Sequence, residues 1–130
     1  MKPLENIKAQ KLLNKIQRDL MRNGIITNTL IGDLKQLRDY VVEEGQPLLA
    51  KVIRLTTEHV EEYQSFNIAI PEDDPIEDDE ENQEVRVEEE ITGQESLAYL
   101  FSLMEDHTNR VNEIELRDYI QAFTAYAEEH

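Results

Sequence analysis

The chain has 130 residues, a formal net charge of −16 and no cysteine. A chain of this length can bury a core without covalent cross-links, and the lack of cysteine excludes disulfides and thiolate metal sites. The longest near-apolar run, LAYLFSLM at residues 97–104, is far shorter than the roughly 20 residues that span a bilayer. The segment MKPLENIKAQ is charged and is unlike a signal peptide, so we expect a cytoplasmic protein.

The negative charge is concentrated in one segment. Residues 71–90 hold twelve acidic side chains and one basic side chain, whereas residues 1–24 have a net charge of +4. Residues 25–70 and 91–130 contribute −3 and −6. An acidic body repels nucleic-acid phosphates and anionic membrane surfaces. The composition therefore predicts a basic protein as the partner, with no nucleic acid and no membrane.

Three helices are predicted in the N-terminal half. Gly24 and Gly45 end the first two, because glycine tolerates the left-handed backbone at a helix C-terminus. Thr27 or Asn28 is the expected N-cap of the second helix, and Pro47 suits the first turn of the third. The apolar stripes are Ala9, Leu12, Leu13, Ile16 and Leu20; Leu30, Ile31, Leu34, Leu37 and Val41; and Leu48, Val52, Leu55, Thr56, His59 and Tyr63.

Two further helices are predicted after the acidic segment. Thr92 with Glu95, and Asn112 with Glu115, have the spacing of a capping box. The stripe of the fourth helix includes His107. The two stripes are Ser96, Leu97, Leu100, Leu103, Met104 and His107; and Leu116, Tyr119, Ile120, Phe123, Tyr126 and Ala127.

These patterns predict an all-α protein, a compact antiparallel bundle of four to five helices in a single domain of residues 1–130. Residues 1–66 form a three-helix unit, residues 67–91 an acidic excursion, and residues 92–130 a helical hairpin. Within the excursion, the alternating triplets Ile68-Ala69-Ile70 and Val85-Arg86-Val87 are also compatible with a short β-hairpin around the acidic loop.

The acidic segment allows three interpretations: a solvated loop, a docking surface, or a cage for a hard cation. A calcium loop of the EF-hand type needs a glycine at its sharp turn, and residues 71–90 contain none. The solvated loop is therefore the simplest interpretation, with docking next and the metal cage last. The residues proposed to contact a partner are Glu72, Asp73, Asp74, Glu77, Asp78, Asp79, Glu80 and Glu81.

Residues 104–115, between the last two helical patterns, resemble an EF-hand in their helix-loop-helix arrangement. Glu115 would stand at the last ligand position and Asp106 at the third. Met104 occupies the first ligand position and Asn109 the glycine position, so no calcium site is predicted.

His59 and His107 are the polar exceptions on their apolar stripes. Their rings would approach each other if the third and fourth helices were to face one another. A ferritin-like di-iron site needs a glutamate three residues before each histidine, but Thr56 and Met104 stand there. The simplest interpretation is a pair of hydrogen-bonded boundary histidines, and no cofactor is predicted.

The favoured functional hypothesis is a non-enzymatic protein-interaction module, a small acidic adapter or regulator that binds a basic protein surface. One alternative is a nucleic-acid-mimicking inhibitor or immunity-type protein, which would carry regularly spaced acids on ordered helices. A second is a metal-dependent enzyme that uses carboxylates, or His59 and His107, with a metal.

A homo-oligomer is also expected. Tyr40, Tyr99, Phe101 and Ile114 lie off the main apolar stripes. Surplus apolar surface on a helical bundle is commonly covered by another chain. The basic residues of the first helix, in contrast, are interpreted as its solvated face. These are Lys2, Lys8, Lys11, Lys15, Arg18 and Arg22.

Overall fold

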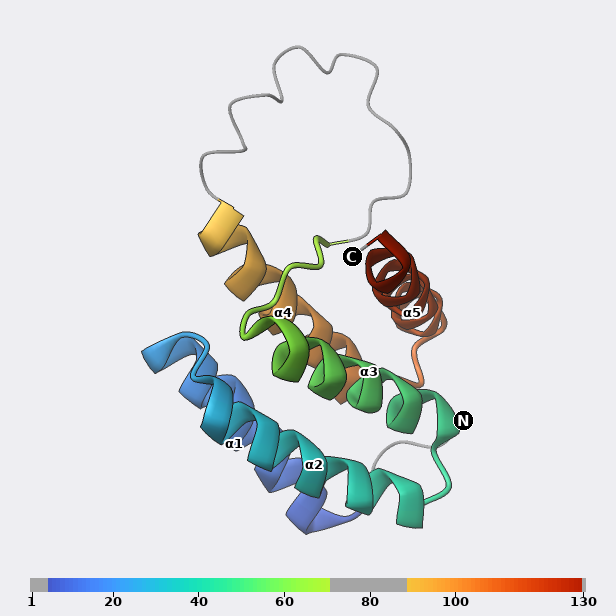
Figure 1. Cartoon of the computed structure of the whole chain (residues 1–130). Helices are drawn as coiled ribbons and strands as arrows, with labels where there is room; N and C mark the ends of the chain where they lie inside the picture. Colours follow the sequence, from blue (N-terminus) through green and yellow to red (C-terminus); the bar gives the residue numbers. More distant parts are fainter. Residues whose placement is uncertain (1–4, 71–88, 130) are drawn as a thin grey trace.

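Five α-helices account for most of the chain in the computed structural model, which describes residues 5–70 and 89–129 (Figure 1). These two ranges contain no β-strand, and the predicted all-α class is confirmed. The helices are α1 (Ile7–Asn23), α2 (Thr27–Glu43), α3 (Pro47–Tyr63), α4 (Glu89–Glu105) and α5 (Arg110–Glu129).

Helix α1 has side-chain capping at its start and a glycine at its end. Asn6 Oδ1 accepts the backbone N–H groups of Lys8 at 2.8 Å and Ala9 at 3.2 Å, two donors that have no partner within the helix. Gly24 has a φ of 73°, and its N–H donates to the Leu20 carbonyl at 2.9 Å. The predicted stop at Gly24 is therefore confirmed, for the backbone reason given above.

Two helices begin earlier than the sequence indicated. Helix α2 already includes Thr27, because Ile26 occupies the N-cap position and its carbonyl accepts the Leu30 N–H at 2.9 Å. Helix α4 begins at Glu89, so Thr92 lies inside the helix and is not its cap. Both predicted caps were wrong, since a polar residue near a helix start indicates a boundary only to within a few residues.

Helix α5 also begins earlier than predicted, because Asn109 caps it instead of Asn112. Asn109 Oδ1 accepts the N–H groups of Val111 at 2.9 Å and Asn112 at 3.3 Å. Only residues 106–109 separate α4 from α5. This turn is shorter than the twelve-residue loop of an EF-hand, so the resemblance does not extend beyond the helix-loop-helix arrangement.

The helices form a closed circuit of neighbours. Helix α1 packs against α2 and α4, α2 packs against α3, and α5 packs against α3 and α4. At one end of the α1–α2 pair, the Glu44 carboxylate accepts the N–H groups of Glu5 at 3.0 Å and Asn6 at 2.7 Å. The Gln94 side chain of α4 donates to the Leu20 carbonyl of α1 at 3.1 Å, which joins the two parts of the chain on either side of residues 71–88.

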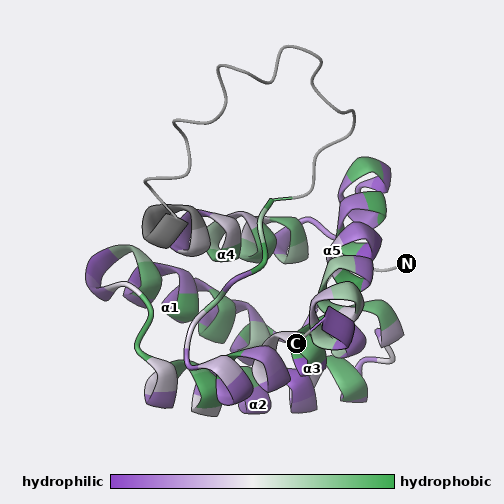
Figure 2. Ribbon diagram, turned by 45° about the horizontal axis from the view of Figure 1, so that its top comes forward, coloured by the Kyte–Doolittle hydropathy of each residue, from purple (hydrophilic) through white to green (hydrophobic). Residues whose placement is uncertain are grey.

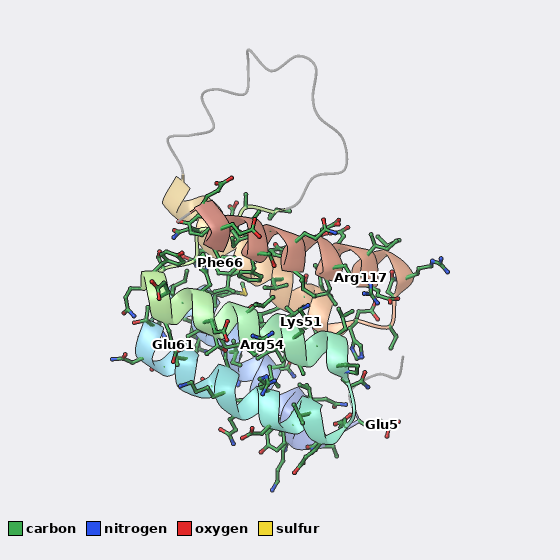
Figure 3. All side chains as sticks on the ribbon, turned by 45° about the vertical axis from the view of Figure 1, so that its right-hand side comes forward. Glu5, Lys51, Arg54, Glu61, Phe66 and Arg117 are labelled. Carbon is green, nitrogen blue, oxygen red and sulfur yellow. The ribbon has the colours of Figure 1, made fainter. Side chains whose placement is uncertain are left out.

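Helices α3 and α5 lie side by side and run in the same direction (Figure 3). Leu48, in the first turn of α3, shares a groove with Ile120 of α5. Further along both helices, the His59 ring meets the Tyr126 ring. The sequence indicated antiparallel neighbours because it considered only helices joined by short turns, and α3 and α5 are not consecutive.

One continuous core joins all five helices. Hydrophilic and hydrophobic residues alternate around each helix, as Figure 2 shows. The predicted stripes supply most of the buried side chains, because each helix turns its apolar face toward the centre of the circuit. Central members of this core are Leu13, Ile16, Leu34, Leu37, Val52, Ile53, Leu97, Leu100, Leu116 and Tyr119.

Residues 64–70, which we call the strap, follow α3 without regular secondary structure. Gln64 ends the helix in the left-handed conformation, and Phe66 and Ile68 are buried in the core. The predicted strand at residues 68–70 does not occur. Its expected partner, residues 85–87, lies outside the described residues, so the hairpin as a whole stays a prediction.

Gly93 lets α4 approach the strap closely. A β-carbon built at Gly93 would lie 2.5 Å from the Phe66 carbonyl oxygen, closer than real contacts allow. The two segments on either side of residues 71–88 therefore meet backbone to backbone.

Candidate functional site

The eight acidic residues predicted to bind a partner, Glu72 to Glu81, lie outside the described residues. The structure does describe the chain on both sides of them, in the strap and in α4. The candidate site is therefore built from the residues that hold these two segments.

His59 lies at the centre of this region. The residue is 6% exposed, and its Nε2 accepts the backbone N–H of Asn67 in the strap at 3.0 Å. Four aromatic rings surround it, from α3, the strap and α5. Their ring centroids lie at 4.8 Å for Tyr63, 5.5 Å for Phe66, 5.6 Å for Phe123 and 5.1 Å for Tyr126.

This environment keeps the His59 imidazole neutral. Burial lowers the pKa of His59 to about 4, because the charged ring would lose its hydration. Since Nε2 accepts a hydrogen bond, the single proton of the neutral ring is on Nδ1. His59 is thus a hydrogen-bonded histidine, as the sequence suggested, although its partner is the strap backbone.

Nδ1 of His59 has no hydrogen-bond partner within the described residues. No fully buried side-chain nitrogen or oxygen in that part of the chain lacks a partner, so Nδ1 retains contact with solvent. His59 lines a cleft of about 330 Å³ between α3 and α5. The lining consists of Leu55, Glu58, His59, Glu62, Tyr63, Phe123 and Ala127.

The rim of this cleft is acidic. Glu58 forms an exposed ion pair with Arg54 at 3.2 Å, whereas Glu62 has no ion-pair partner among the residues that the structure describes. The pKa of the Tyr63 hydroxyl is raised by burial first and then by the negative charge of Glu62. The cleft thus combines aromatic walls with two carboxylates.

Two tyrosines of α5 hold the surrounding segments together. Tyr126 accepts a hydrogen bond from the Asn67 side chain of the strap at 3.1 Å. Tyr119 is fully buried and donates to the Ser96 carbonyl of α4 at 2.9 Å, with the Ser96 hydroxyl also at 2.9 Å. Burial raises the pKa of Tyr119 well above its usual value. Helix α5 therefore fixes both the strap and the first half of α4.

His107 lies elsewhere and does not share a site with His59. Its Nδ1 lies 3.3 Å from the Met104 carbonyl in the last turn of α4. The rings that contact His59 come from α3, the strap and α5, so the pair of facing histidines considered from sequence is not formed. Within the described residues, no group of three or more histidine, aspartate and glutamate side chains could hold a metal ion.

Among the other clefts formed by the described residues, two are lined by charged side chains. One of about 210 Å³ separates α1 from α2, with Asp19 and Asp33 on its rim. Lys15 bonds both carboxylates, and these hydrogen bonds raise the pKa of Lys15. The other, about 480 Å³, lies between α3 and α5, with Lys51 and Arg117 beside an apolar floor (Figure 3).

Helix α1 exposes five of its predicted basic residues. Lys8, Lys11, Lys15, Arg18 and Arg22 are all solvent-exposed, opposite the buried face of the helix. Lys2, the sixth, lies outside the described residues.

No family model, curated protein or solved structure matches this chain. None of the described helices is both long enough and apolar enough to cross a membrane.

The sequence analysis did not predict that the strap is packed into the core or that Gly93 approaches it closely. A visible signal for the strap was Phe66, an aromatic residue two positions after Gln64, where α3 ends. No signal in the sequence could have paired Gly93 with Phe66, because their contact depends on how α4 returns to α3.

Proposed function

We propose that this chain is a non-enzymatic protein-interaction module, a small acidic adapter or regulator. Its acidic residues Glu72, Asp73, Asp74, Glu77, Asp78, Asp79, Glu80 and Glu81 bind a basic surface of a partner protein. The observation that carries the proposal is the firm attachment of the chain on both sides of these residues, by the strap and by α4.

Attachment at both ends supports binding by charge. The described chain on the two sides of the acidic residues is held together, because Asn67 is bonded to His59 and Gly93 meets the Phe66 carbonyl. A high local density of carboxylates attracts a basic surface over a distance of roughly 10 Å at physiological salt. Complementary charge of this kind mainly accelerates encounter and selects the partner.

The compartment and the oligomeric state complete the proposal. We propose that the protein acts in the cytoplasm, that it binds no nucleic acid through its acidic body, and that it forms a homo-oligomer. Of the four side chains expected to cover an oligomer interface, Phe101 is buried within the chain, and Tyr40 and Tyr99 pack partly against its core. Ile114 remains exposed, as does its neighbour Val111.

The first test is capture of partners from native extract. The wild-type chain and a variant with the eight acids changed to Asn or Gln are immobilised, eluted with a salt gradient and analysed by mass spectrometry. We expect basic proteins that the wild type retains at low salt and releases at moderate salt, and that the variant does not retain.

The matched control neutralises eight exposed acids elsewhere. These are Glu5, Asp39, Glu43, Glu95, Glu105, Asp106, Glu128 and Glu129. The control should capture the same proteins as the wild type. Equal loss in both variants would indicate an effect of net charge alone and would contradict the proposed role of the acidic segment.

A further inference from the structure

The cleft beside His59 has the lining of a site for a cationic side chain. Tyr63 and Phe123 supply aromatic surface, and Glu58 and Glu62 supply negative charge at the rim. Planar cations stack on aromatic rings and pair with carboxylates, and the guanidinium group of arginine does both. Glu58 is paired with Arg54 on the exposed surface of α3. The Glu62 carboxylate has no ion-pair partner in the described part of the chain.

His59 adds a hydrogen-bond donor to the same cleft. It is more than nine-tenths buried, and Nδ1–H has no acceptor among the described residues. A donor held in a largely buried ring favours an acceptor that approaches through the cleft. A main-chain carbonyl of an extended peptide can fill this role while its side chain reaches the carboxylates.

We propose that this cleft binds an arginine side chain of an extended basic segment in the partner protein. The guanidinium group lies between the aromatic surface and the carboxylates of Glu58 and Glu62, and the peptide carbonyl accepts the Nδ1–H of His59. This inference rests on the proposed function, and it adds a specific anchor to the less specific attraction of the acidic segment.

The position of the cleft supports this combination. The strap contacts His59 directly through Asn67 and Phe66, so the cleft lies beside the point where the chain enters the acidic segment. The groups around His59 that carry or acquire charge are Glu58 and Glu62 on α3, the Tyr63 hydroxyl on α3 and the Tyr126 hydroxyl on α5. Of these, only the carboxylates are charged near neutral pH, and both favour a cation.

The test uses the whole 130-residue chain and two synthetic peptides of arginine, glycine and serine. In the second peptide, citrulline replaces arginine, which keeps the shape and removes the charge. Backbone amide, aromatic and histidine resonances are followed by two-dimensional NMR. We expect the arginine peptide to shift the signals of His59, Tyr63 and Phe123 in a saturable manner, and the citrulline peptide to leave them unchanged.

Two double variants test whether the arginine peptide binds at the cleft beside His59. Glu58→Gln with Glu62→Gln should weaken peptide binding at the cleft by about threefold to tenfold. Glu43→Gln with Glu105→Gln removes the same charge from exposed positions on α2 and α4, and should leave binding at the cleft within about twofold of the wild type. Equal weakening in both variants would overturn the proposed site.

The variant with the eight neutralised acids separates the two proposals. Shifts at His59, Tyr63 and Phe123 that persist in this variant would support the cleft as a site of its own. Shifts confined to residues 72–81 of the wild type would overturn the cleft and leave the acidic segment as the binding surface. An arginine peptide that shifts neither set would contradict both proposals.

Discussion

At the scale of single residues, burial determines the protonation state of His59. The sequence placed this histidine on an apolar stripe, and the fold surrounds it with four rings and a backbone N–H donor. Burial among these groups favours the neutral ring, and so does the hydrogen bond that Nε2 accepts. Protonation would turn Nε2 from an acceptor into a donor that opposes the Asn67 N–H.

The stability of the fold should therefore depend on pH through His59. Its pKa is about 4 in the folded chain and 6.5 when unfolded, so the unfolded chain binds the proton more strongly between these values. The contribution of the neutral ring, up to about 3 kcal/mol, is fully present above pH 6.5 and is lost as the pH falls toward 4.

His59→Gln measures this contribution, because glutamine can accept the same hydrogen bond and does not titrate. Denaturant unfolding at several pH values between 4 and 7 should show the wild type losing more stability than the variant as the pH falls. A constant difference in unfolding free energy between the two proteins over this range would contradict the assigned cause. The carboxylates titrate in both proteins and cancel in the comparison.

At the scale of elements, the contact between α4 and the strap requires a glycine, Gly93, at the point of closest approach. Helix α4 includes Gly93, although glycine is a poor helix former. The cost is offset by a close backbone approach, since a β-carbon at Gly93 would lie only 2.5 Å from the Phe66 carbonyl oxygen.

Gly93→Ala should destabilise the protein by about 1–3 kcal/mol, because the strap must shift to avoid the added carbon. Gly32→Ala is the matched control, since Gly32 also lies within a helix and a β-carbon there would meet nothing within 4 Å. We expect that variant to be more stable by about 0.5–1 kcal/mol. Urea denaturation measures both. A stabilising Gly93→Ala would show that the close approach is absent in solution.

At the scale of the whole molecule, the circuit of five helices accounts for most of the apolar surface that the sequence left without a partner. Phe101 is buried in the core of the same chain, although it lies off the main stripe of α4. At the start of α5, Val111 is 61% exposed and its neighbour Ile114 is 53% exposed. An interface between copies could use this pair. The other exposed large apolar residues of the described ranges are Ile7, Met21, Ile26 and Val42.

If copies associate through the start of α5, Val111→Ser with Ile114→Ser should convert the oligomer to a monomer. Sedimentation velocity at micromolar concentrations measures the mass of both proteins. Val42→Ser is the control, because Val42 is similarly exposed on α2. A monomeric wild type would rule out the predicted homo-oligomer.

The sequence by itself determined the five helices, their approximate bounds and the side chains that form the core. These features follow from local rules: apolar spacing at the helical period, glycine at helix ends, and Pro47 in a first turn. The sequence did not determine the exact first residue of each helix. Asn109 and Asn112 are both acceptable N-caps of α5, and only the backbone geometry distinguishes them.

The tertiary structure decided what the residues far apart in sequence do together. The parallel neighbours α3 and α5, the cleft beside His59 and the contact between Gly93 and Phe66 all join segments separated by residues 71–88. Periodicity fixes which face of a helix is buried, but it contains no information on which helix covers that face. That choice comes from the packing of all five apolar faces at once, and it brings His59, the strap and Gly93 of α4 together.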